Sequence, residues 1–129
     1  MVKLIVGKSG SVKSREVITR ALTHSAAGKI VTIMTGELDR DDYEKKLIRG
    51  TVSDKIWFVY MFGHDGDKYL ARLMKAPIDS VVYIDAPRVW RDEEILVIKA
   101  IANLRKLMVY VTTQANRNSD LVGVSYVDA

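Results

Sequence analysis

Short apolar runs alternate with amphipathic stretches along the whole chain. The apolar runs are rich in Val and Ile, which favours strands. We expect strands at residues 2–6, 29–35, 56–62, 80–84 and 107–113, and a sixth at residues 122–127 is left open. The stretches between them place apolar residues at helical spacing and predict helices at residues 12–27, 40–49, 68–75 and 92–106. Asp39 is expected to cap the second helix, and Gly50 to follow its end.

The alternation of strand and helix predicts an α/β fold. Parallel strands need a crossover between them, so this order implies a three-layer α/β/α arrangement around a mostly parallel sheet of five strands, or six. No internal repeat or linker is visible, so a single domain over residues 1–129 is expected. The third strand is apolar on both faces, and its aromatic residues are expected in the core. These are Trp57, Phe58, Tyr60 and Phe62.

Composition narrows the class of protein without deciding it. The chain has 129 residues, of which 48% are hydrophobic and 28% charged, as in an ordinary globular domain. The absence of Cys excludes disulfides and thiolate chemistry. The longest apolar run, residues 56–62, is too short to span a membrane, so no membrane partner and a cytoplasmic location are expected. The net charge of +4 is compatible with a nucleic-acid partner and does not require one.

A Gly- and Ser-rich loop joins the first predicted strand to the first helix. It consists of Gly7, Lys8, Ser9, Gly10, Ser11, Val12, Lys13 and Ser14. A strand, a loop ending in Lys-Ser and a helix form a phosphate-binding P-loop, whose backbone N–H groups point at an anion. Lys13 adds positive charge, and the Ser14 hydroxyl is a ligand for Mg²⁺. Val12 stands where the motif has its second glycine, a position where a β-branched residue can resist the backbone conformation.

Polar residues follow the end of every predicted strand. They are Thr35, Gly36, Glu37, His64, Asp65, Asp85, Thr112, Thr113, Gln114 and Asn116. In an open parallel sheet the carboxyl ends of the strands meet at one edge, where ligands bind. Phosphoryl transfer to water needs an anion cradle, a carboxylate for Mg²⁺ and a carboxylate that polarises water. Ordinary turn chemistry is the alternative interpretation of each residue taken singly.

Three further features have a structural interpretation that we favour. His64, Asp65 and Asp67 lack a convincing set of metal ligands and are expected in a solvated loop. His24 lies late in the first helix and is expected at the surface. Trp90 is expected to pack under the loop after the fourth strand, with a subunit or nucleic-acid contact as the alternative.

Nearly all of the chain resembles the P-loop ATPase core shared by RecA-type recombinases and DnaB-type replicative helicases. Four segments carry the resemblance in the same order and at similar spacing: residues 7–14, 35–38, 81–85 and 109–117. The resemblance implies that ATP and Mg²⁺ are the cofactors. Lys13 would contact the β- and γ-phosphates, Ser14 would bind Mg²⁺, and Asp85 would hold Mg²⁺ through water.

The resemblance also implies which residues act in hydrolysis. Glu37 would be the catalytic carboxylate that orients the attacking water. Gln114 would sense the γ-phosphate with support from Thr113, and Arg117 is a candidate for action in a neighbouring subunit's site. Ala86 follows Asp85, so the Asp-Glu pair of many other ATPases is disfavoured and a catalytic Glu after the second strand fits better.

The resemblance implies a homo-oligomer that acts on nucleic acid in replication, recombination or genome packaging. The chain ends soon after the fifth strand, which is typical of a minimal core encoded by a virus or mobile element. Two alternatives stay open. Val12 motivates a degenerate module that does not hydrolyse ATP, and binds a protein or nucleic acid instead. Lys8 and the Asp85-Ala86-Pro87 segment resemble ParA/MinD-type ATPases.

Overall fold

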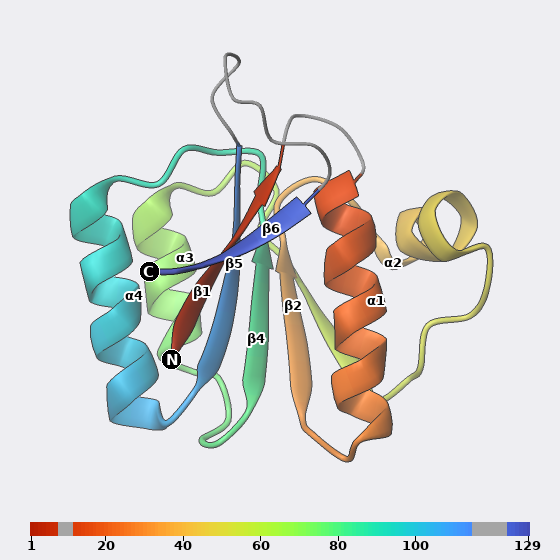
Figure 1. Ribbon diagram of the computed structural model, residues 1–129, viewed down its shortest axis with the longest axis horizontal. Helices are drawn as coiled ribbons and strands as arrows, with labels where there is room; N and C mark the ends of the chain where they lie inside the picture. The colour runs from red at the N-terminus through yellow and green to blue at the C-terminus, as the bar shows by residue number, and fades with distance from the viewer. Residues whose placement is uncertain (8–11, 115–123) are drawn as a thin grey trace.

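The computed structural model describes residues 1–7, 12–114 and 124–129, which form one six-stranded sheet between two layers of helices (Figure 1). The strands are β1 (Val2–Gly7), β2 (Val31–Thr35), β3 (Ile56–Tyr60), β4 (Val81–Asp85), β5 (Met108–Gln114) and β6 (Val124–Asp128). The helices are α1 (Val12–Ala26), α2 (Arg40–Asp42), the π-helix η1 (Tyr43–Ile48), α3 (Gly66–Leu73) and α4 (Asp92–Arg105). The predicted three-layer α/β/α fold is confirmed.

The strand order is β3-β2-β4-β5-β1-β6. All neighbouring strands run parallel except β6, which pairs antiparallel with β1. The mostly parallel sheet is therefore confirmed, and the sixth strand is present at the C-terminal end. Because β6 covers β1, the strand that leads into the Gly- and Ser-rich loop lies inside the sheet.

The core consists of two apolar clusters, one on each face of the sheet. Figure 1 shows α3 and α4 on one side and α1 with α2 on the other. Successive side chains of β4 point to opposite faces, so Ile84 joins the cluster under α4 while Tyr83 joins the one under α1. Every residue of β2 and β4 is buried, as expected for strands covered on both faces.

The aromatic residues at and just beyond β3 correct an expectation. Trp57 is 68% exposed, Tyr60 47% and Phe62 49%, so the prediction that they lie in the core is wrong for these three. Of the four, only Phe58 is partly buried in the core. The cause is the strand order, because β3 forms an edge of the sheet and the helices cover it incompletely. Hydrophobicity on both faces of a strand does not distinguish a central strand from an edge.

The second predicted helix differs from a plain α-helix. Asp39 caps it as expected, because its carboxylate accepts a hydrogen bond from the Asp42 N–H at 2.9 Å. After α2, however, the chain continues as the six-residue π-helix η1. It ends at Arg49 in a left-handed conformation, and the Gly50 N–H donates to the Glu44 carbonyl at 3.0 Å. In the described residues, no helix is both long and apolar enough for a membrane span.

Candidate functional site

A small cavity of about 70 Å³ lies at the carboxyl ends of the strands. It is lined by Lys13, Ser14, Glu37, Asp85, Ala86, Pro87 and Thr112. The structure thus brings together four residues that the sequence singled out from three separate segments: Lys13 and Ser14 in the first turn of α1, Glu37 after β2, and Asp85 at the end of β4.

Other predicted site residues lie outside what the structure describes. Lys8, Ser9, Gly10 and Ser11 of the loop, and Asn116 and Arg117 after β5, are among them. Gln114 is placed by its backbone alone, as the last residue of β5, in register with Gly7 of β1. Its position beside the start of the Gly- and Ser-rich loop is consistent with a role at this edge.

Lys13 is buried, with only 8% of its surface exposed. Its ammonium group donates a hydrogen bond to the Gly7 carbonyl at 3.0 Å, so the side chain folds back over the loop. Burial lowers the pKa of Lys13, and the nearby Asp85 carboxylate acts in the opposite direction. A buried ammonium group at a helix N-terminus is suited to bind an anion, because both the charge and the helix dipole favour one.

Val12 has no unusual backbone conformation. It is the first residue of α1, and its side chain is 47% exposed. Among the described residues other than glycine, positive φ occurs only at Arg49, Asp79 and Lys106. The expected conflict between a β-branched side chain and the backbone is therefore absent at this position.

Asp85 is 8% exposed, and burial raises the pKa of its carboxyl group. Hydrogen bonds from Tyr43 and Ser14 lower this pKa, the Glu37 charge raises it further, and the Lys13 charge lowers it. The Tyr43 hydroxyl donates to Asp85 Oδ2 at 2.6 Å. Such a short bond is typical of a hydroxyl that donates to an ionised carboxylate.

The turn that carries Glu37 is fixed at both ends. The Gly36 N–H donates to the Asp85 carbonyl at 2.8 Å, which ties the end of β2 to β4. A Cβ atom at Gly36 would collide with the Tyr69 hydroxyl, so this close approach requires glycine. The Thr35 hydroxyl donates to the Leu38 carbonyl at 2.8 Å across the same turn. Glu37 itself is exposed and reaches the cavity from its open side.

Sequence reasoning missed one residue of the site, Tyr43. It is completely buried and bonded to Asp85, although 42 residues separate the two in the chain. Tyr43 and Leu47 lie four residues apart, which indicates a buried face of the second helix. That spacing carries no signal for the bond to Asp85. Burial raises the pKa of Tyr43, as does the Asp85 charge, so the phenol stays protonated and donates.

The oxygen atoms at the cavity fit a hard divalent cation. Mg²⁺ typically binds through one or two carboxylates plus substrate phosphates, and it keeps several waters. Asp85 and the Ser14 hydroxyl offer such a partial set of ligands. The described residues contain no group of three or more His, Asp or Glu that could hold a metal by itself. Any cation here would therefore depend on the phosphates of a bound ligand.

The remaining candidates are structural. His64, Asp65 and Asp67 are exposed, and Asp65 caps α3, in agreement with a solvated loop. Trp90 packs in the core as expected, edge-on to Tyr69 at 5.4 Å. His24 corrects an expectation, because it is half-buried and its Nδ1 lies 2.8 Å from the Tyr83 hydroxyl. A position late in a helix did not reveal that contact.

Comparison with known proteins places this fold. No protein-family model matches the sequence, and no curated protein matches it either. The ATPase domain of a DnaB-like helicase superposes with a TM-score of 0.63 at 14% identity, covering 90% of this chain and 57% of that one. The flagellar accessory protein FlaH from Methanocaldococcus jannaschii gives a TM-score of 0.57 at 17% identity, covering 92% of this chain and 62% of that one.

These comparisons define the class of fold. The chain has the RecA-like P-loop ATPase core, with the β1–loop–α1 unit where such a core binds phosphate. It spans less than two thirds of the length of both structures.

Proposed function

We propose that this chain binds ATP together with Mg²⁺ at the cavity beside α1. The convergence of Lys13, Ser14, Glu37 and Asp85 on one cavity carries the proposal, because these residues come from three segments and supply complementary chemistry. Bound Mg²⁺ would neutralise charge on the phosphates. Lys13 would exchange its hydrogen bond to the Gly7 carbonyl for the β- and γ-phosphates. Ser14 and Asp85 would hold the cation.

We propose that the bound ATP is hydrolysed with Glu37 as the carboxylate that orients water. Glu37 and Asp85 are the acids that line the cavity among the described residues. Asp85 is buried and bonded to Tyr43, whereas Glu37 is exposed and has room for a water molecule. Gln114 at the end of β5 would sense the γ-phosphate. A second candidate is a module that binds without hydrolysing, favoured by Val12 in place of the motif glycine.

The test is isothermal titration with Mg·ATP on the wild-type chain and on Lys13→Ala. We expect Lys13→Ala to weaken binding at least about tenfold, since it removes a charge-assisted contact to phosphate. Lys29→Ala is the matched control, because Lys29 lines a different cavity beside His24. Absence of wild-type binding up to millimolar ATP, or equal affinity in Lys13→Ala, would contradict the proposal.

Hydrolysis is tested separately with Glu37→Gln. We expect loss of phosphate release with unchanged affinity for Mg·ATP, because the amide cannot act as a base. Glu93→Gln, an exposed change at the start of α4, is the control. Wild-type binding without any turnover would select the non-hydrolysing module.

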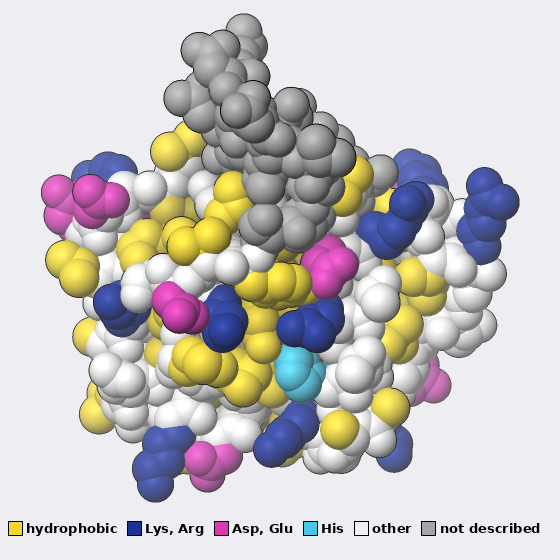
Figure 2. All heavy atoms as spheres, viewed as in Figure 1, with side chains coloured by type: hydrophobic (Ala, Val, Ile, Leu, Met, Phe, Trp, Pro, Cys, Tyr) yellow, Lys and Arg dark blue, Asp and Glu magenta, His cyan; other side chains and the backbone are white. Residues whose placement is uncertain are grey.

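We further propose that the chain acts on nucleic acid as a homo-oligomer in the cytoplasm. The net charge of +4 and the RecA-like core support this. Figure 2 shows Lys and Arg scattered among Asp and Glu on the face over β6, so the described basic residues do not form a single patch there. Affinity for single-stranded nucleic acid should fall steeply with salt. An affinity independent of salt would point to a protein partner.

A further inference from the structure

Tyr43 contacts Asp85 from outside the P-loop motif and the other predicted site segments. Its hydroxyl donates to Oδ2 at 2.6 Å, and both residues are shielded from water. The predicted role of Asp85 is to hold Mg²⁺, but nothing in the motifs explains what orients a carboxylate on a strand so that one oxygen faces the cavity. With Oδ2 engaged by Tyr43, Oδ1 is left for the cavity.

The Tyr43 ring is fixed by its surroundings. It packs against Phe58 with 5.5 Å between ring centroids, and it belongs to the apolar cluster under α1. It is also the first residue of the π-helix η1. Short π-helical segments occur frequently at functional sites.

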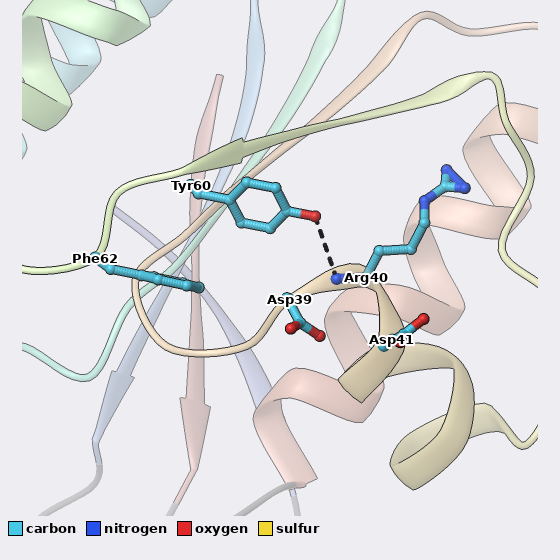
Figure 3. Close-up of a pocket in the computed structure, with 5 residues that line it drawn as sticks. All are labelled: Asp39, Arg40, Asp41, Tyr60 and Phe62. Carbon is cyan, nitrogen blue, oxygen red and sulfur yellow. Dashed lines mark hydrogen bonds between the residues drawn. The ribbon is translucent and has the colours of Figure 1, made fainter.

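The segment before Tyr43 is anchored to the edge of the sheet. Figure 3 shows the Arg40 N–H donating to the Tyr60 hydroxyl, a bond of 3.3 Å, beside the Phe62 ring. The Arg40 guanidinium donates to the Ser53 carbonyl at 3.0 Å and pairs with Asp54 at 3.2 Å. Together with the Asp39 cap, these contacts hold the start of the segment. The phenol therefore has little freedom to leave Asp85.

The same segment also carries Glu37. From Glu37 the chain passes through the Asp39 cap directly into Tyr43. The two ends of this connection meet at β4, since Gly36 bonds to the Asp85 backbone and Tyr43 to the Asp85 side chain. Movement of the proposed water-orienting residue and of the proposed metal ligand is thereby coupled through one short piece of chain.

We infer that Tyr43 is a positioning residue that holds the Asp85 carboxylate in the orientation that binds Mg²⁺. The inference rests on the proposed function, because it concerns the same site. Tyr43 touches neither phosphate nor cation and acts through Asp85. Its loss should affect the part of nucleotide affinity that depends on Mg²⁺ and leave the part measured without Mg²⁺ unchanged.

The experiment compares ATP affinity with Mg²⁺ and with EDTA in the wild-type chain and in Tyr43→Phe. The substitution keeps the ring that packs on Phe58 and removes only the hydroxyl. Partners behind a metal ligand typically contribute about 10- to 100-fold in metal affinity, so we expect Mg²⁺-dependent affinity to fall at least about tenfold. Affinity in EDTA should stay within about twofold of wild type, which a general loss of structure would not allow.

Tyr83→Phe is the matched control. Tyr83 is equally buried and also hydrogen-bonded through its hydroxyl, but to His24 rather than to Asp85. A double-mutant cycle adds a second readout: in an Asp85→Ala background, Tyr43→Phe should cause no further loss of Mg²⁺ dependence. Urea unfolding of each variant ensures that binding refers to folded protein.

The outcomes separate this inference from the proposed function. If wild type binds Mg·ATP and Tyr43→Phe keeps the same Mg²⁺ dependence, the positioning role is wrong and nucleotide binding stands. An equal loss in Tyr83→Phe, or a further loss in the Asp85→Ala background, also overturns the role. If wild type binds no nucleotide, the proposed function fails and this inference fails with it.

Discussion

At the scale of single residues, the site depends on groups that are costly to bury. Lys13 and Asp85 are both 8% exposed, and each lowers the cost of burying the other through its opposite charge. Asp85 gains further stabilisation from Tyr43 at 2.6 Å. Even so, burial dominates and the pKa of Asp85 is raised. Such tension between stability and chemistry is common where a charged group must meet a ligand.

This tension predicts a pH-dependent effect of Asp85→Asn. An acid whose pKa is raised on folding destabilises the folded state once it ionises. Below its ordinary value of 3.8 the carboxyl is protonated in both states, so the cost disappears. We expect Asp85→Asn to unfold at higher urea concentration than wild type at pH 7, and at the same concentration near pH 3. Asp79→Asn, an exposed change, should show no such trend. A stabilisation independent of pH would rule out ionisation as the cause.

At the scale of secondary-structure elements, the connection between β2 and β3 decides the shape of the site. The Asp39–Asp42 capping box starts α2, since each side chain accepts a hydrogen bond from the other residue's backbone N–H. The π-helix that follows places Tyr43 against Asp85. The start of this segment therefore determines whether Tyr43 reaches β4.

We predict that Asp39→Ala destabilises the chain by about 1 kcal/mol, the typical cost of losing an N-cap. Asp41→Ala is the control, because Asp41 is exposed and only pairs with Lys45 at 3.4 Å. Its loss should cost no more than about 0.5 kcal/mol. Free energies of unfolding from urea titrations give both values. Equal effects of the two substitutions would mean that the cap does not stabilise this segment.

At the scale of the whole molecule, the strand order decides which side chains are buried. β3 and β6 are the two edges of the sheet, and β4 lies inside. The aromatic residues of β3 consequently differ in environment, from half-buried Phe58 to Trp57 at 68% exposure.

Trp57→Ser should therefore change the free energy of unfolding by no more than about 0.5 kcal/mol, as for other exposed positions. Ile33→Ala on neighbouring β2 removes a fully buried side chain and should cost about 2–5 kcal/mol. The two substitutions are compared by urea unfolding under identical conditions. A large loss for Trp57→Ser would show that this aromatic surface is covered, for instance by a second copy of the chain.

Local sequence patterns were enough to predict most of the elements, the parallel α/β fold and the four cavity residues Lys13, Ser14, Glu37 and Asp85. They were enough because strand and helix periodicity is local, and because the carboxyl ends of parallel strands must meet at one edge. Long-range packing, by contrast, made β3 an edge and placed β6 beside β1. It also brought Tyr43 to Asp85. These contacts join residues far apart in the chain, and no local pattern of hydrophobic and polar positions encodes which strands become neighbours.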